Sequence, residues 1–130
     1  MNLDNTFAVL KPDLSVEPVV VSPTIYADLD ANFDHFKSHV LVSTHEFDSD
    51  WGMWEKHPAG DEIVMLLSGS AQMVLETDSG SEVVKLDTPN TYTIIPRNTW
   101  HTARVSAPTR MLFITPGDGT EHRPLRPGTE

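Results

Sequence analysis

The sequence predicts an all-β protein, an antiparallel barrel or sandwich, with one short helix near its start. Segments rich in β-branched and apolar residues follow one another from Ser38 to Thr115, with turn-forming residues between them. Short strands at this regular spacing are typical of barrels and sandwiches. The helix is predicted where Ser22 and Pro23 have the form of an N-cap followed by proline at the first helical position.

The region before the barrel has weaker patterns. Residues Met1–Pro18 mix scattered apolar and charged side chains, so we expect an arm with little regular structure, followed by a short strand at Val19–Val21. A helix from Pro23 to Phe33 is then expected to pack against the barrel. Its apolar residues follow at i, i+4 and i+8, on one helical face: Ile25, Leu29 and Phe33.

The barrel strands follow in chain order, each bounded by turn signals. They are Ser38–Phe47, the two sides of a hairpin around residues 58–61, Ser70–Glu76, Glu82–Leu86, Thr91–Ile95, Trp100–Val105 and Thr109–Thr115. From Pro116 the chain is rich in Gly and Pro, so we expect a loosely held tail. The chain thus divides into an arm with a helix (1–37), a barrel (38–116) and a tail (117–130).

Composition narrows the class of function. The 130 residues suit one domain, and 9 Lys plus Arg against 19 Asp plus Glu give a formal net charge of −10. This argues against nucleic-acid or anionic-membrane partners, whose binding surfaces are basic. There is no Cys, so any metal must be held by nitrogen and oxygen ligands.

We expect a cytoplasmic protein. The first residues lack the basic region and apolar run of a signal peptide. The longest clean apolar run, Ile63–Leu67, is far too short to span a bilayer.

The most informative stretch is Trp51–Gly69, in which His57 and Glu62 flank the turn-forming segment Pro-Ala-Gly-Asp. Interpreted as a hairpin, it makes these two residues the closing cross-strand pair, with Cβ atoms roughly 4.5–5.5 Å apart. An imidazole and a carboxylate at that spacing can share a metal ion. A third ligand could come from His101, in the later stretch Ile94–Val105.

These two stretches resemble the two motifs of the cupins, a family of small double-stranded β-barrel proteins. The first cupin motif is Gly, a spacer, His-x-His, three or four residues, Glu, six residues and Gly. The matching residues in this chain are Gly52, Glu55-Lys56-His57, Glu62 and Gly69. Glu55 therefore stands where the first His of the motif is expected.

The second cupin motif is Gly, five residues, Pro-x-Gly, two residues, His, three residues and Asn. The matching residues are Asn90, Pro96-Arg97-Asn98, His101 and Val105. Asn90 and Asn98 replace glycines, which Asn can do because it tolerates left-handed backbone conformations. Val105 replaces the closing Asn. The resemblance covers about Asp50–Val105 closely.

The resemblance implies a double-stranded β-helix, or jelly-roll-like barrel, with one divalent metal inside. His57, Glu62 and His101 are the implied ligands, and Glu55 is a candidate fourth ligand. Such an oxygen-rich set leaves manganese, iron, nickel or zinc open. In the competing interpretation the change from His to Glu marks a metal-free site, where Glu62 pairs with His57 or with loop backbone.

Three functions stay open on the sequence. The first is a metal-dependent enzyme acting on a small organic molecule as an oxygenase, isomerase or decarboxylase, because two His and one carboxylate compose the facial triad of non-haem iron oxygenases. The second is a non-catalytic ligand-binding or sensing cupin. The third is a metal-free structural cupin. The substrate is not readable from these residues.

Other His and Trp residues have less specific expectations. His45 shares a strand face with Leu41, Ser43 and Phe47 and could line the barrel interior, whereas His122 is expected to be solvated in the tail. The three Trp residues are expected to pack, with Trp100 alternating away from His101.

The strand that begins at Glu62 is apolar on both faces, since Ile63, Met65 and Leu67 alternate with Val64 and Leu66. A strand of this kind is covered on both faces. The cover is either the N-terminal arm or a second subunit, and we expect a homodimer.

Overall fold

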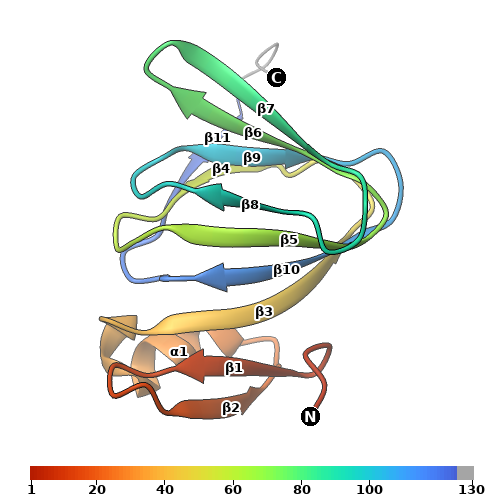
Figure 1. Cartoon of the computed structure of the whole chain (residues 1–130). Coiled ribbons are helices and arrows are strands. Elements are labelled where there is room, and N and C mark those ends of the chain that lie inside the picture. Colours follow the sequence, from red (N-terminus) through yellow and green to blue (C-terminus); the bar gives the residue numbers. More distant parts are fainter. Residues whose placement is uncertain (126–130) are drawn as a thin grey trace.

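Two antiparallel sheets face each other to form the barrel in the computed structural model, which describes residues 1–125 (Figure 1). One sheet contains, in spatial order, β2 (Val16–Val20), β1 (Thr6–Leu10), β3 (Val40–Phe47), β10 (Thr109–Thr115), β5 (Glu62–Ser68) and β8 (Tyr92–Ile95). The other contains β11 (Glu121–Pro124), β4 (Met53–Lys56), β9 (His101–Arg104), β6 (Ala71–Thr77) and β7 (Gly80–Leu86). The predicted all-β, jelly-roll-like barrel is confirmed.

The barrel core lies between the two sheets, because alternate residues of each strand point inward. The side chains that are almost fully buried there come from both sheets, among them Val64, Leu66, Met73, Leu86, Ile95 and Met111. The predicted two-residue period therefore holds on the strands of both motifs.

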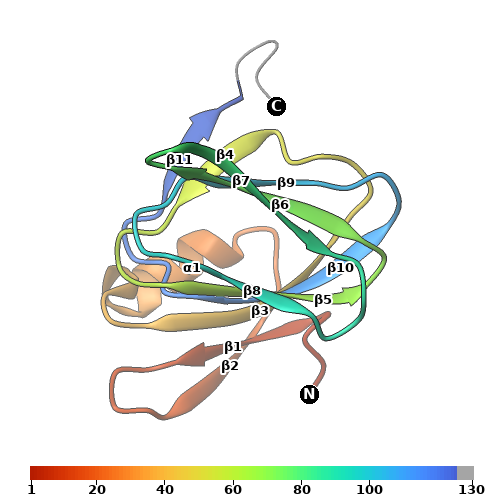
Figure 2. The same cartoon turned by 45° about the horizontal axis from the view of Figure 1, so that its top comes forward.

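The predicted helix is confirmed as α1 (Ile25–Asn32), followed by a short 3₁₀ helix η1 (Asp34–Phe36). Ile25 and Leu29 of α1 are buried in a second apolar cluster that contains Phe7 of β1 and Leu41 of β3. Figure 2 shows α1 on the inner side of β3, beside one open end of the barrel. Within the described residues, neither helix has the length and apolar composition needed to cross a membrane.

The N-terminal arm is more ordered than the sequence analysis expected. Thr6–Leu10 and Val16–Val20 form a hairpin that joins the sheet through pairing of β1 with β3. Phe7 and Val9 alternate into the second cluster, and this two-residue period was the signal that the sequence analysis missed. Pro18 is tolerated because β2 is an edge strand.

The predicted hairpin around residues 58–61 is wrong. β4 pairs with β9 and β11, whereas β5 pairs with β10 and β8, so the two strands belong to different sheets. The connecting loop crosses between the sheets and is held by the turn of the second motif. Asn98 N donates to His57 O at 3.1 Å, and Arg97 N donates to Asp61 Oδ1 at 2.8 Å. Turn-forming residues indicate a change of direction but not the partner strand.

The Asn substitutions in the second motif behave as predicted. Asn90 has φ = 77° and Asn98 has φ = 61°, so both occupy the left-handed region. Gly69, which closes the first motif, has φ = +83° and leaves no space for a side chain against Pro108 and Thr109. The left-handed backbone at these three motif positions therefore explains why they hold Asn or Gly.

The predicted loose tail contains a strand, because β11 pairs with β4 over Glu121–Pro124. Residues 126–130 of that tail lie outside the described residues. The division into arm, barrel and tail at 1–37, 38–116 and 117–130 stays a prediction.

Candidate metal centre

The four residues that the sequence analysis singled out come together inside the barrel from three places. Glu55 lies on β4 and His57 directly follows that strand, Glu62 is the first residue of β5, and His101 is the first residue of β9. The His57, Glu62 and His101 side chains are almost fully buried, while Glu55 is partly exposed. Buried groups of this polarity require partners.

His101 presents a lone pair to the site. Its Nδ1 lies 3.0 Å from the carbonyl oxygen of Thr99, which can only accept a hydrogen bond. In the neutral imidazole the proton therefore sits on Nδ1, and Nε2 carries the lone pair.

His57 is held in the same tautomer, with its proton on Nδ1, through a hydrogen bond to Thr120. Its Nδ1 lies 2.8 Å from Thr120 Oγ1, and the Thr120 hydroxyl donates to the carbonyl oxygen of Gly117 at 2.9 Å. Because that hydroxyl proton is already used, Thr120 accepts from the Nδ1–H of His57. The Nε2 of His57 is thus also a lone-pair atom.

Glu62 is oriented by Thr115, whose hydroxyl donates to Oε2 at 2.6 Å. The other oxygen, Oε1, lies 3.1 Å from His101 Nε2 and 3.3 Å from His57 Nε2. Despite these short distances, none of the three atoms has a hydrogen-bond partner. With both imidazoles in these neutral tautomers, three buried acceptor atoms therefore converge on one point.

A divalent metal fits this arrangement. Ligands bound to one ion at roughly 2.0–2.2 Å stand about 3 Å apart, close to the two separations observed around Glu62. Neutral imidazole nitrogen and carboxylate oxygen are the donor types that such ions take. Each histidine also donates its other ring N–H to an oxygen, as metal-ligating histidines almost always do.

Glu55 is the outermost member of the group. Its Oε1 lies 3.6 Å from His57 Nε2, and its Oε2 lies 3.4 Å from His122 Nε2. Ligand atoms of Glu55, His57 and His101 all lie within 4.8 Å of one another. Glu62 is nearer to both imidazoles than Glu55 is to His57, so the geometry supports a core of three residues with Glu55 beside it.

Without metal, a proton on an imidazole can neutralise part of the charge of the Glu62 carboxylate. Burial raises the pKa of the Glu62 carboxyl, but the neighbouring His101 and His57 outweigh this and lower the pKa to about 2. Burial lowers the pKa of His101, but Glu62 outweighs it and the pKa lies above its ordinary value. A metal would therefore compete with a proton on these imidazoles.

A cavity of about 1040 Å³ opens onto this group. Glu55, His57 and Glu62 line one part of it. The rest of the lining comes from both helices, from β3 and β10 with the segments that follow them, and from single residues of β4 and β11. A small organic molecule in this cavity would lie beside the candidate metal ligands.

Several residues of this region were not among the candidate site residues of the sequence analysis. His45 lines the cavity, and its Nε2 lies 2.9 Å from the hydroxyl of Tyr26 on α1. His122, expected in solvent, reaches Glu55 because β11 pairs with β4. Thr115 and Thr120 orient two of the candidate ligands, and no sequence motif marked them. The alternation of β3 was a signal for His45 that the sequence analysis noted without relying on it.

Comparison with known proteins identifies the class of fold. The sequence matches no protein-family model and none of the curated proteins. Among solved structures, it is similar to oxalate decarboxylase of Bacillus subtilis, with a TM-score of 0.54 and 19% identity over 74% of this chain and 26% of that one. It is also similar to hydroquinone 1,2-dioxygenase of Sphingomonas sp. TTNP3, with a TM-score of 0.51 and 15% identity over 58% of each chain.

A third similar structure is a cupin-2 domain protein of Shewanella frigidimarina, with a TM-score of 0.49 and 14% identity over 65% of this chain and 71% of that one. The chain therefore shares the barrel fold of the oxalate decarboxylase and the hydroquinone 1,2-dioxygenase, and is a small cupin-fold domain. The chain spans only about a quarter of the oxalate decarboxylase, so that enzyme's activity does not carry over with the fold.

Proposed function

We propose that this protein is a metal-dependent cupin enzyme that binds a small organic molecule in its central cavity. His57, Glu62 and His101 hold the metal, and Glu55 is the fourth ligand. The observation that carries the proposal is the convergence of three buried acceptor atoms with no hydrogen-bond partner. Such atoms are costly to bury together unless a cation lies between them.

The metal, when bound, supplies a Lewis acid beside the cavity. The protein's own residues fix the chemistry around it. Thr99 and Thr120 hold the two imidazoles in the tautomer that presents Nε2, and Thr115 holds Glu62. In this proposal Glu62 is a ligand and not a general base, because Thr115 occupies Oε2 and the metal would take Oε1. Manganese, iron, zinc and nickel all suit the donor set, and the similar oxalate decarboxylase has Mn(II) centres.

The first experiment is elemental analysis of protein purified without added metal, followed by titration of stripped protein with the four metals. We expect at least one to bind with a Kd tighter than about 1 μM, roughly −8.2 kcal/mol. His57→Ala should abolish this binding and Glu55→Ala should weaken it. Glu82→Ala, at an exposed position on β7, is the matched control for Glu55→Ala. If none of the four metals binds, the proposal is wrong.

The second experiment asks whether the protein is an enzyme. Candidate acids, sugars and diketones are offered to metal-loaded and stripped protein, with and without air. We expect turnover only in the loaded form. Binding without turnover would instead favour a ligand-binding or sensing cupin. A Glu62→Gln variant with full metal content and no activity would make Glu62 a base.

A further inference from the structure

The cavity beside the metal ligands has a wall of aromatic rings. Trp51 packs against Phe47 and Phe113, with ring centroids 5.4 and 6.0 Å away, and all three line the cavity. The Trp51 ring also lies 6.2 Å from that of His101. The aromatic wall is therefore continuous with the candidate metal centre.

The cavity lining contains four histidines (His35, His45, His57 and His122) and no Lys or Arg, and its remaining charged side chains are carboxylates. Besides the candidate ligands Glu55 and Glu62, they are Asp30, Glu46, Asp48 and Asp50. Asp30 is paired with His35 at 3.1 Å. No Lys or Arg of the described residues pairs with the other three carboxylates, which are exposed near the cavity mouth.

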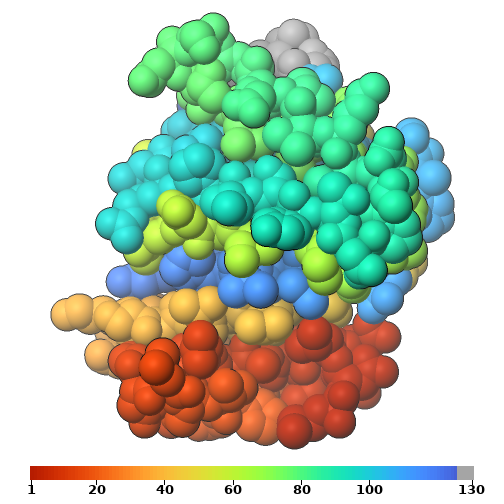
Figure 3. All heavy atoms as spheres, in the orientation of Figure 1, coloured from red at the N-terminus to blue at the C-terminus, as the bar shows by residue number. Residues whose placement is uncertain are grey.

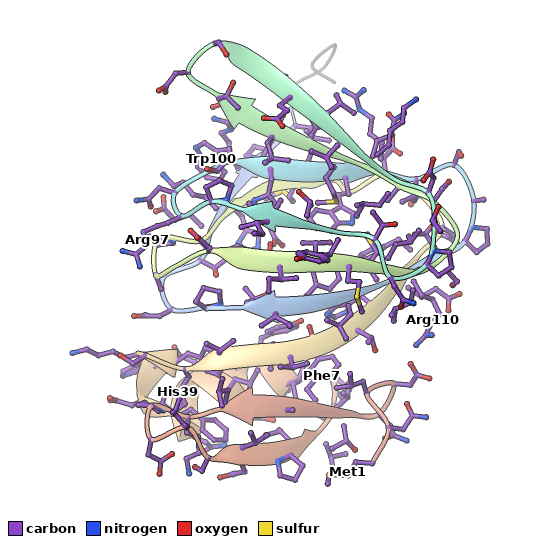
Figure 4. The ribbon with its side chains drawn as sticks, in the orientation of Figure 1. Met1, Phe7, His39, Arg97, Trp100 and Arg110 are labelled. Atoms are coloured by element: carbon purple, nitrogen blue, oxygen red, sulfur yellow. The ribbon has the colours of Figure 1, made fainter. Side chains whose placement is uncertain are left out.

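No Lys or Arg of the described residues lines this cavity. Figure 4 shows Arg97 and Arg110 at opposite ends of the barrel, directed outward. Arg97 donates to Ala59 O, and Arg110 pairs with Asp4 near the N-terminus. Lys56 and Arg123 lie over the Trp100 ring, on the outer side of the second sheet.

We propose that the ligand of this cavity is a small organic cation, an amine whose ammonium group lies between the aromatic wall and the acidic mouth. Aromatic faces attract cations, Trp most strongly, and nearby carboxylates add to this attraction. A carboxylate ligand would instead lie among four carboxylates that are not candidate metal ligands, with no Lys or Arg in the lining. This inference rests on the proposed function, because it names the ligand class of the same site.

The test uses three probes of similar size that differ in charge: 2-phenylethylamine, 2-phenylethanol and phenylacetate. Their affinities are measured by calorimetry on zinc-loaded and on stripped protein at low salt. We expect the amine to bind about tenfold tighter than the alcohol in both forms, with the acid weakest. Equal affinities for amine and alcohol, tighter binding of the acid, or no binding of any probe at millimolar concentration would overturn the inference.

Two double variants test whether the carboxylates at the cavity mouth cause the preference for the amine. Glu46→Gln with Asp48→Asn removes two carboxylates there, and Asp78→Asn with Glu82→Gln removes two exposed carboxylates near the turn between β6 and β7. We expect the first pair to weaken amine binding severalfold and to leave alcohol binding unchanged, while the second pair changes neither. Equal effects of the two pairs would overturn the proposed position of the ammonium group.

The two proposals can fail separately. Zinc content decides the metal site, whereas the charge preference in stripped protein decides the ligand class. A protein that binds no metal but prefers the amine would contradict only the metal assignment.

Discussion

At the scale of single residues, the candidate site depends on where protons sit. His57 and His101 can act as ligands only because their Nδ1 protons are directed at oxygen atoms outside the metal group. Thr120 is the more informative of these partners, since its own hydroxyl proton is held by Gly117. Outer partners of this kind typically contribute 10–100-fold to metal affinity.

Replacing Thr120 with Val should therefore weaken metal binding about 10–100-fold, because His57 loses the acceptor that fixes its tautomer. Metal titration of the stripped variant measures this change. Thr102→Val is the matched control, since Thr102 is also buried but its hydroxyl donates to Met53 O, away from the candidate ligands. An equal loss in both variants would mean that general destabilisation, and not tautomer control, lowers the affinity.

The pH dependence of metal-free stability follows from Glu62 and His101. The lowered pKa of Glu62 stabilises the fold above the ordinary carboxyl value of 4.5, and this contribution is lost as the pH falls toward about 2. The raised pKa of His101 stabilises the fold below its ordinary 6.5, and this is lost as the pH rises through the higher folded value. Both contributions are fully present only between pH 4.5 and 6.5.

The destabilisation caused by Glu62→Gln in metal-free protein should therefore be largest near pH 5.5 and smaller at pH 9. Chemical unfolding of wild type and variant with a chelator present measures this difference, and comparing the two proteins cancels the other titrating groups. With metal bound, the wild type should instead gain stability as the pH rises, because metal replaces protons on the ligands. A pH-independent difference would argue against coupling between Glu62 and His101.

At the scale of elements, the turn between β5 and β6 has a strict backbone requirement. Gly69 has φ = +83°, and a Cβ there would lie 2.5 Å from Pro108 O and 2.6 Å from Thr109 Oγ1. Thr109 in turn is fully buried and bonds to Ser70, which joins this turn to the start of β10.

Gly69→Ala should lower the free energy of unfolding by roughly 1–3 kcal/mol from backbone strain alone, and by more because of the close contacts. At Gly52, the other glycine of the first motif, a Cβ would have no neighbouring atom within 4 Å. Gly52→Ala should therefore change stability by less than about 0.5 kcal/mol. Denaturant unfolding of the two variants tests the contrast, and equal effects would contradict it.

At the scale of the whole molecule, one outer face of the barrel is apolar. Ile114, Ile63 and Ile94 form one row across β10, β5 and β8, and Leu112, Met65 and Tyr92 form the next. Figure 3 shows the side of the molecule on which these strands lie. The N-terminal hairpin does not cover this face, because it extends the sheet beyond β3. The alternative that the arm covers β5 is thus wrong, and a homodimer stays our prediction.

Light scattering should give about twice the monomer mass of 14.5 kDa in dilute buffer. Ile94→Lys should return the protein to the monomer, because Ile94 is 53% exposed at the centre of the edge strand β8. Val83→Lys is the control, since Val83 is 48% exposed on β7 of the other sheet. A monomer mass for the wild type across concentrations would contradict the dimer.

The sequence by itself determined the local features of this protein. These features are the turns, the alternation of apolar side chains and the left-handed backbone at Asn90 and Asn98. They depend on the intrinsic preferences of residues that are neighbours in the sequence. The two spaced motifs also located the candidate ligands His57, Glu62 and His101.

Only the tertiary structure decided which strands pair and which groups meet across them. Strand pairing joins residues far apart in sequence, and the same apolar run can pair with several partners. For this reason β4 and β5 were expected in one hairpin but belong to different sheets. The roles of Thr120 and His122, and the acidic lining of the cavity, arise from contacts between distant segments, and local preferences contain no information about such contacts.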